Sequence, residues 1–555
     1  MSARRRPTDR SALRVVVLAL ASLFACAAPR SATPAVGVAA AAPPPASPDH
    51  LQALRAYIRT AWAPLTRTRA TLPEAAIDPK FPRADGSPWP VYVPHAVDPR
   101  AIDAELTAIL PPAARATLAL LRLPDGHQPP AAPGLLYLPR PYVVPGGRFN
   151  EMYGWDSYFI LLGLLTDGRV AQARDITDDF LYEVENYGGV LNANRTYYLT
   201  RGQPPFLSEM VLAVYHATGD RRWLAAARDA VVAEHAHWTA PPHLIPGLGL
   251  SRYFDHGEGP APEVVAAERD ARGLTHYDRV RAWYRAHPDA ARGSSTFYDA
   301  ASDRLTPLFF KGDRSMRESG FDPSDRFGPF GADVIHYAPV CLNTLLFAME
   351  NDLADIDGLL GRDADAAAWK ARAQERLARI DEVLWDEAAG LYYDYDFSTH
   401  HRRAYAFATT FWPLWAGLAS REQAARVHAN LPLFERPGGV VTSTTISGSQ
   451  WDAPFGWAPL QMFAVEGLRR AGFGDDADRI AKAFLSMLGE DFARRGTLLE
   501  KYDVVRRTSM LGDALTFGYT SNEVGFGWTN GVALMFLEGT DSRAPLGHGP
   551  SPGSP

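Results

Sequence analysis

The chain has 555 residues, of which 46% are hydrophobic and 21% charged, and its formal net charge is −7. This apolar fraction is enough for a large core, so global disorder is excluded. The 63 acidic and 56 basic residues leave no cationic excess, and no nucleic-acid partner is expected. Two cysteines cannot build a disulfide framework. Length alone would suggest three or four domains.

The N-terminus has the composition of a targeting segment. Five arginines between residues 4 and 14 precede an apolar run from Val15 to Ala28. This pattern predicts a signal peptide over residues 1–28, and therefore an exported protein, periplasmic or anchored to the envelope. Ordinary cleavage near Ala25 and lipid anchoring at Cys26 both stay open. No other segment has about 18 uninterrupted apolar residues, so no membrane span is expected.

Composition also predicts the domain boundaries. Residues 29–48 are rich in Ala and Pro, which is typical of a flexible tether, and residues 543–555 resemble a frayed tail. Between them, residues 49–542 contain no comparable linker. We therefore expect one large domain, and a monomer.

Helix-turn-helix patterns dominate this domain. Apolar residues recur at helical spacing over Leu207–Ala217, Trp223–His237, Ala364–Leu384 and Ala477–Leu488. Glycine and aspartate precede the last three segments, where Gly would end one helix and Asp would cap the next. Strand-like alternation is scarce. The pattern predicts an all-α fold, an α/α toroid or a helical bundle, with the chemistry on connecting loops.

Two loops combine aromatic, acidic and basic side chains. The first, PGGRFNEMYGWDSY, covers residues 145–158, and the second, QWDAPFGWAP, covers residues 450–459. Neither has helical or strand periodicity. Rings beside carboxylates suit a sugar, whose apolar face stacks on indoles while its hydroxyls bind acids and guanidinium groups. Two such loops indicate a carbohydrate site.

Both loops resemble the signature motifs of the trehalases, inverting glycoside hydrolases of family 37. Four further blocks are similar to that family in the same order: NANRTYYLTRGQPP (192–205), ESGFD (318–322), EKYD (500–503) and GFGWTNGV (525–532). The resemblance implies an (α/α)6 toroid that hydrolyses the disaccharide α,α-trehalose to two glucose molecules.

The resemblance also assigns roles. It makes Asp322 the general acid and Glu500 the general base, the two carboxyl groups that inverting hydrolysis requires. Asp325 is a rival acid three residues away, and a plain ion pair with Lys501 is the alternative for Glu500. Family positions further imply a set of substrate-binding residues: Arg148, Trp155, Asp156, Asn194, Arg201, Gln203, Glu263 and Gly320, with Trp451 as a stacking platform.

The chain departs from the family pattern at two places. Ala261 stands where the family usually has a binding arginine, and the Gly-rich stretch that carries an acid reads FGYTSNE here, with Tyr519 near the acid's position. Glu523 would replace that acid only if the loop is rearranged. Two alternatives therefore stay open: the same mechanism on another α-glucoside or α-linked disaccharide, and a catalytically silent sugar-binding protein.

No metal or cofactor is expected. The 15 histidines show no paired spacing of the H-E-x-x-H kind. The acidic segment Asp386–Asp396 does not fit a calcium loop, and a hairpin between helices is predicted there. Cys341 is predicted to be a small buried residue in a helix that covers Val340–Met349.

Overall fold

A computed structural model describes residues 47–83, 86–126, 128–265, 269–270, 272–291, 297–512, 515–519 and 521–539. The predicted signal peptide (1–28), all but the end of the predicted tether and the predicted tail (543–555) lie outside these residues. The domain boundaries at 49 and 542 stay a prediction. No helix among the described residues is long and apolar enough to cross a membrane.

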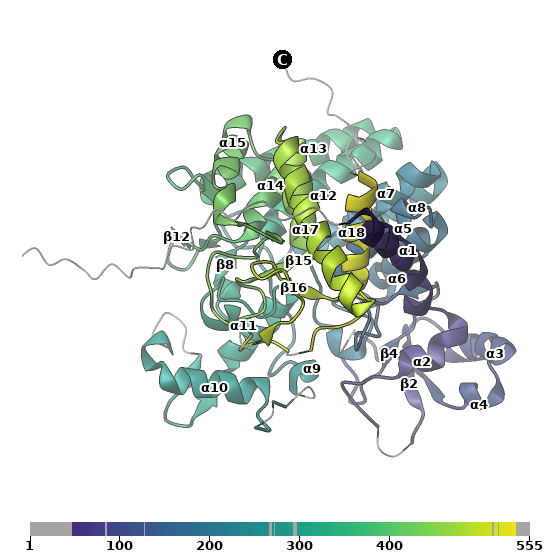
Figure 1. The fold of residues 1–555 in the computed structure, drawn as a ribbon. Coiled ribbons are helices and arrows are strands. Elements are labelled where there is room, and N and C mark those ends of the chain that lie inside the picture. The colour runs from purple at the N-terminus through teal and green to yellow at the C-terminus, as the bar shows by residue number, and fades with distance from the viewer. Residues whose placement is uncertain are drawn as a thin grey trace, which may run out of the picture. The chain divides into compact units, whose positions relative to one another are not determined.

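Twelve helices of the described chain alternate between an inner and an outer ring (Figure 1). The inner helices are α5 (Gly154–Thr166), α7 (Leu207–Thr218), α12 (Val340–Leu359), α14 (Trp412–Trp415), α16 (Ala458–Arg470) and α18 (Gly527–Gly539). Each inner helix packs against the next, and α18 packs against α5, so the inner ring is closed. The outer helices are α1 (Pro48–Leu65), α6 (Val170–Tyr187), α8 (Arg221–Trp238), α13 (Asp363–Val383), α15 (Arg421–Ala429) and α17 (Gly474–Arg495). This is the (α/α)6 toroid.

Residue patterning separates the two rings. Helix α5 is apolar on all sides and buried over most of its length, as a helix enclosed by neighbours must be. The outer helix α13 buries only a stripe at helical spacing: Trp369, Ala373, Arg376, Ile380 and Val383. Charged residues cover its other faces, which are exposed to solvent on the outside of the ring.

Glycines bring together the two helices that close the inner ring. A Cβ atom on Gly531 of α18 would lie 2.1 Å from the carbonyl oxygen of Phe159 in α5. A Cβ on Gly163 of α5 would lie 2.5 Å from the Cα of Gly531. Larger residues would therefore push the first and last inner helices apart. In Figure 1, α18 (yellow) also lies beside α1 (dark purple), which packs on it.

The predicted helix starts are only partly confirmed. Gly219 adopts φ 66° after α7, and the side chain of Asp220 caps α8 by accepting the backbone N–H of Trp223 at 3.0 Å. The prediction of aspartate caps is wrong at Asp363 and Asp475, which lie inside the first turns of α13 and α17. Those helices begin earlier than predicted, and acids in the first turn still stabilise them through the helix dipole.

Short strands and helices decorate the loops of the toroid. The strand pairs are β1 (Thr66–Arg67) with β5 (Tyr142–Val143), β6 (Tyr298–Asp299) with β7 (Arg304–Leu305), β9 (Trp385–Asp386) with β10 (Leu391–Tyr392), β13 (Glu435–Arg436) with β14 (Gly439–Val440), and β15 (Phe455–Trp457) with β16 (Lys501–Asp503). Two three-stranded sheets are β3 (Leu118–Arg122), β2 (Trp89–Val93), β4 (Leu135–Leu136), and β12 (His401–Arg402), β11 (Tyr395–Asp396), β8 (Tyr337–Ala338). The remaining helices are α2 (Leu72–Ala76), α3 (Pro99–Ile109), α4 (Pro112–Arg115), α9 (Pro262–Val265), α10 (His276–Ala286) and α11 (Pro307–Glu318). The hairpin β9–β10 confirms the prediction between α13 and α14.

Helix α12 confirms the prediction for Cys341. The helix covers the predicted segment Val340–Met349 and continues to Leu359. The Cys341 side chain is fully buried within it, beside the hydroxyl of Tyr253. Burial raises the pKa of the thiol, which keeps it protonated.

Candidate active site

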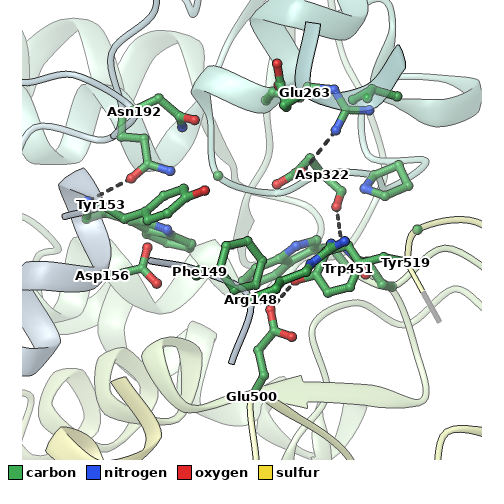
Figure 2. Close-up of a pocket in the computed structure, with 18 of the residues that line it drawn as sticks. Arg148, Phe149, Tyr153, Asp156, Asn192, Glu263, Asp322, Trp451, Glu500 and Tyr519 are labelled. Carbon is green, nitrogen blue, oxygen red and sulfur yellow. Dashed lines mark hydrogen bonds and ion pairs between the residues drawn. The ribbon is translucent and has the colours of Figure 1, made fainter. Parts of the chain in front are cut away.

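One pocket collects nearly all of the site residues predicted from the sequence (Figure 2). Those that line it are Arg148, Trp155, Asp156, Arg201, Gln203, Glu263, Gly320, Asp322, Trp451 and Glu500. They come from loops far apart in the chain, which the closed ring of helices brings to one end. Asn194 does not line the pocket.

Asp322 lies in the loop that follows α11. Its carboxylate Oδ2 lies 3.2 Å from Nη1 of Arg317, the penultimate residue of that helix. The Asp322 side chain keeps 32% of its surface exposed, toward the pocket. The surrounding protein excludes water and raises the pKa of Asp322 to about 6, although the charge of Arg317 opposes this shift. The carboxyl group therefore holds a proton in mildly acidic solution, as a general acid must.

Glu500 enters the pocket from the opposite side in Figure 2, immediately before β16. It is 1% exposed, and the hydroxyl of Tyr519 donates a hydrogen bond to its Oε1. Lys501 Nζ lies 3.8 Å from Oε2, which accepts no hydrogen bond from the described residues. Burial raises the pKa of Glu500, while Lys501 and the Tyr519 hydroxyl lower it. One oxygen is thus held in place, and the other has free lone pairs.

Gln450 connects the two chain segments that carry Asp322 and Glu500. Its side-chain carbonyl accepts a hydrogen bond from Lys501 Nζ at 3.1 Å, and its amide donates to the backbone carbonyl of Asp322. The next residue, Trp451, donates its backbone N–H to the carbonyl of Pro323 at 3.1 Å. Strand β15, a few residues further on, pairs with β16 in a register that sets Trp457 opposite Lys501. The second aromatic loop therefore holds both sides of the pocket together.

Lys501 does more than form an ion pair. Its Nζ lies 3.6 Å from the centre of the Tyr519 ring and also donates to the backbone carbonyl of Tyr519 at 3.3 Å. Burial lowers the pKa of Lys501 to about 8, and the Glu500 charge opposes this shift. Its distance of 3.8 Å to Glu500 is longer than its hydrogen bonds to Gln450 and to the Tyr519 carbonyl. Its bonded partners are Gln450 and Tyr519, so the plain ion pair does not describe this residue.

The rival acid, Asp325, faces away from the pocket lining. Its Oδ1 accepts the backbone N–H of Phe330 at 3.1 Å, and its own N–H donates to Asp452 at 2.9 Å. Asp452 in turn accepts hydrogen bonds from the hydroxyls of Tyr405 and Ser443. Both aspartates are occupied in supporting the loops, which leaves Asp322 as the carboxyl group of this segment that lines the pocket.

The first aromatic loop presents its acid from the first turn of α5. The backbone N–H of Trp155 donates to the side chain of Gln203 at 2.9 Å, which fixes the start of the helix. Gly320 adopts φ 77°, and a Cβ atom there would lie 2.8 Å from the Trp155 ring, so only glycine permits this approach. Burial raises the pKa of Asp156 well above its ordinary value, and the charge of Glu500 adds to the shift.

Tyr519 and Glu523 divide the position where the family has an acid. Tyr519 lines the pocket, with the guanidinium of Arg148 4.3 Å from its ring centre. The Glu523 carboxylate accepts the backbone N–H of Arg148 at 2.9 Å and lies 3.6 Å from its Nε, behind the lining residues. Glu523 therefore orients Arg148, while the hydroxyl of Tyr519 bonds to the carboxylate of Glu500.

Two arginines, Arg201 and Arg317, lie near Glu263, although Ala261 stands where the family usually has a binding arginine. Arg201 forms a short ion pair with Glu263, which lowers the pKa of that carboxyl together with the charge of Arg317. Ala261 is fully buried, with its N–H bonded to the Tyr277 hydroxyl at 3.1 Å. Arg317 lines the same pocket. A guanidinium group therefore lies beside Glu263 and Asp322 despite the alanine.

The structure gives Asn194 a backbone contact instead of a place in the pocket. Its side-chain oxygen accepts the N–H of Met152 at 2.9 Å, and its amide donates to the carbonyl of Leu136 at 3.2 Å. Asn192, two residues earlier, lines the pocket in its place. The sequence could not show which of the two asparagines lines the pocket. That choice depends on hydrogen bonds to backbone groups of Met152 and Leu136, which lie more than 40 residues away in the chain.

Sequence reasoning also missed several lining residues: Lys80, Tyr153, Tyr198, His276, Arg279, Arg317 and Gln450. Four of them carried a signal: Tyr153 and Gln450 belong to the two aromatic loops, Tyr198 lies in the block 192–205, and Arg317 directly precedes the block of the acid. Lys80 comes from a distant N-terminal segment, and nothing in its local sequence indicates the site. Its Nζ pairs with the buried Glu151 at 3.1 Å.

Fold and pocket together define a toroidal protein with a site of paired carboxylates, guanidinium groups and indoles, as carbohydrate-active proteins have. The family model described as Trehalase matches residues 116–541. The chain belongs to the trehalase family.

Relatives and a solved structure agree with this assignment. The chain is 39% identical over 441 residues to a protein named cytosolic neutral trehalase from Saccharomyces cerevisiae, covering 73% of this chain and 57% of that one. It is 39% identical over 443 residues to another of that name from Pyricularia oryzae, covering 72% and 59%. The solved structure of neutral trehalase Nth1 from Saccharomyces cerevisiae matches with a TM-score of 0.74 at 34% identity, covering 89% of this chain and 95% of that chain. The chain spans a little over half the length of the curated relatives it matches.

These relatives contradict the predicted export. Proteins of this similarity from four fungi are named cytosolic. The prediction of a periplasmic or envelope-anchored protein rested on the composition of residues 1–28 alone. Basic residues followed by an apolar run are a pattern of composition, which does not establish targeting by itself. The segment, with Cys26, lies outside the described residues.

Proposed function

We propose that this protein hydrolyses α,α-trehalose to two glucose molecules with inversion, using Asp322 as the general acid and Glu500 as the general base. One observation carries the proposal: two carboxyl groups line the same pocket with different exposure and different bonded partners. Asp322 is partly exposed with a pKa raised to about 6, whereas Glu500 is buried with one oxygen bonded by Tyr519. Membership in the trehalase family supports it.

Asp322 donates its proton to the glycosidic oxygen as the bond from that oxygen to the anomeric carbon breaks. A water oxygen forms a bond to the same carbon from the opposite face, and Oε2 of Glu500 takes the water proton. Inverting enzymes separate their two carboxyl groups by about 6.5–9.5 Å to admit this water. The products are one α-glucose, the leaving group, and one β-glucose.

Polar and aromatic groups of the lining suit a disaccharide. The guanidinium groups of Arg148 and Arg201 offer forked donors for neighbouring hydroxyls. The indoles of Trp155 and Trp451, with ring centres 5.6 Å apart, add apolar surface to the lining, although each is only 2% exposed and Trp451 stacks on Trp457. We propose that Arg317, which bonds to Asp313 and Asp322, supplies the positive charge that the family's arginine would have at position 261.

A second substrate class is favoured by a specific observation. Ala261 and Tyr519 both change the chemistry of the substrate wall relative to the family pattern, without touching Asp322 or Glu500. The same mechanism on another α-glucoside is the second candidate. A silent sugar-binding protein is disfavoured because both carboxyl groups are retained in one pocket.

Proton NMR of the anomeric region tests these alternatives. We expect purified protein mixed with trehalose to release α- and β-glucose in equal initial amounts. Turnover of kojibiose or maltose without release from trehalose would move the assignment to the second candidate. Sugar binding without turnover of any disaccharide would contradict hydrolysis. Exclusive initial release of α-glucose would contradict inversion.

A further inference from the structure

Three histidines converge at the end of α8, outside the pocket lining. His237 lies in the last turn of α8, His243 in the turn that follows, and His256 in the loop before α9. Each ring has a nitrogen atom within 4.8 Å of the corresponding nitrogens of the other two. We call these residues the histidine cluster. Its members are separated by up to 19 positions in the sequence, which is why spacing motifs did not reveal it.

The dimensions of the histidine cluster suit a transition metal ion. Zinc binds imidazole nitrogen at about 2.0–2.1 Å, so two nitrogens on one tetrahedral ion lie ~3.3 Å apart. Nitrogens already within 4.8 Å reach that separation by small ring rotations. His256 is exposed and His237 is half-buried, so these two rings can turn and an ion can reach them, while His243 is 1% exposed and held in place.

A buried carboxylate next to the histidine cluster supplies negative charge. Glu318 is fully buried, and its carboxylate lies 3.4 Å from Nε2 of His243. It accepts backbone N–H groups from Phe254 at 2.5 Å and Gly202 at 3.3 Å. Among the described residues, no lysine or arginine forms an ion pair with it. A buried charge without a cationic partner is costly, and a divalent ion beside His243 would compensate it.

Neighbouring groups do not already occupy the histidine cluster. Lys311, whose charge acts on His256, pairs with Glu258 at 2.6 Å and donates to the backbone carbonyls of Asp255 and Gly257. Packing explains the burial of His243, whose ring centre lies 4.7 Å from that of Trp238. It does not explain why the exposed His256 also turns toward the other two rings.

We propose that His237, His243 and His256 bind a divalent transition metal ion, with Glu318 as the carboxylate that balances its charge. Imidazole ligands suit zinc, copper and nickel, and a nearby carboxylate that orients one ligand is typical of such sites. Since Gly202 and Glu318 are bonded, the ion would lie behind the loop that carries Arg201 and Gln203. The proposal is independent of the substrate assigned to the pocket.

Zinc titration of the untagged full chain tests the proposal. After treatment with a chelator and dialysis, calorimetry with Zn²⁺ is expected to give one ion per chain at micromolar or tighter Kd. Cobalt in place of zinc is expected to give the strong visible absorption of a four-coordinate ion. His256→Gln and His237→Gln are each expected to weaken zinc binding by at least about tenfold.

Two further variants keep the result interpretable. His401→Gln removes an exposed histidine of β12 and is expected to bind zinc as the natural chain does. Glu318→Gln is expected to weaken binding while all three imidazoles remain. Because His256 is exposed, its substitution leaves the core intact, and circular dichroism checks this. Absence of saturable binding, or unchanged binding by His256→Gln, overturns the proposal, as does equal weakening by His401→Gln.

Discussion

The loop that carries Asp322 and the residue before β16, Glu500, place two carboxyl groups in the pocket with different neighbours. Both carboxyl groups have raised pKa values because the protein excludes water around them. At Asp322 a guanidinium contacts the carboxylate and part of the side chain stays open to the pocket. At Glu500 the bonded partner is a neutral phenol, and the ammonium of Lys501 is 3.8 Å away.

Different neighbours separate an acid from a base within one pocket. Burial alone would favour protons on both groups. Tyr519 and Lys501 favour the ionised form of Glu500, and its Oε2 accepts no hydrogen bond from the described residues. Arg317 limits the pKa of Asp322 to about 6. The environments of Asp322 and Glu500 can therefore be disrupted separately by substitution.

The largest effects are expected from removing the carboxylates. Asp322→Asn and Glu500→Gln are each expected to lower kcat for trehalose by about 10²–10⁴-fold, the range of general acid–base catalysis. α-Glucosyl fluoride distinguishes the two, because its leaving group needs no proton. Asp322→Asn should retain cleavage of the fluoride, and Glu500→Gln should lose it.

Asp325→Asn is the matched control for this pair. It removes an acid three residues from Asp322 whose bonds run to Phe330 and Asp452. Near-normal kcat is expected. If Asp325→Asn instead abolishes turnover while Asp322→Asn does not, the general acid is misassigned.

Tyr519→Phe is expected to weaken the base side alone. Loss of the hydrogen bond to Oε1 should lower kcat about tenfold, equivalent to ~1.4 kcal/mol of transition-state stabilisation. That bond lowers the pKa of Glu500, so without it the pKa rises and the acidic limb of the kcat/KM profile moves to higher pH. Tyr153→Phe, whose hydroxyl contacts Tyr198 at 3.5 Å, is the control and should leave that limb unchanged.

Arg317→Gln is expected to move the basic limb of the kcat/KM profile, where activity falls as Asp322 loses its proton. Asp322 must be protonated to act, and its pKa is about 6, so kcat/KM should fall as pH rises through that value. Arg317 lowers this pKa, so its removal should raise the pKa and shift the fall to higher pH. Arg279→Gln, which lines the pocket and bonds to Gly518, should leave the limb in place. An unchanged profile in Arg317→Gln would show that the ion pair does not tune the acid.

The smallest effect is expected from the two asparagines. Asn194→Ala removes two buried hydrogen bonds and should lower the free energy of unfolding by about 1–3 kcal/mol with little change in kcat/KM. Asn192→Ala should lower kcat/KM and leave stability nearly unchanged. Denaturant unfolding and kinetics on both variants measure this. If Asn194→Ala instead lowers kcat/KM and Asn192→Ala does not, Asn194 is the residue that contacts the substrate.

Much of the site followed from the sequence, because its residues lie in short blocks with distinctive composition. Arg148, Asp156, Asp322 and Glu500 all line the pocket as the blocks implied. Asn194 did not, since its side chain accepts a hydrogen bond from the N–H of Met152 and donates one to the carbonyl of Leu136. The role of Tyr519 was also out of reach, because its hydrogen bond to Glu500 depends on how a loop folds over the strand end.

The sequence by itself determined the helical class, the alternation of buried and amphipathic helices and the composition of the site loops. These features are local, set by apolar periodicity and by glycine and aspartate at helix ends. Only the tertiary structure decided which side chains share an environment. Closure of the ring through Gly163 and Gly531 brings α18 onto α5, and so joins loops hundreds of residues apart into one pocket. The histidine cluster beside Glu318 depends on the same long-range packing, which no local pattern encodes.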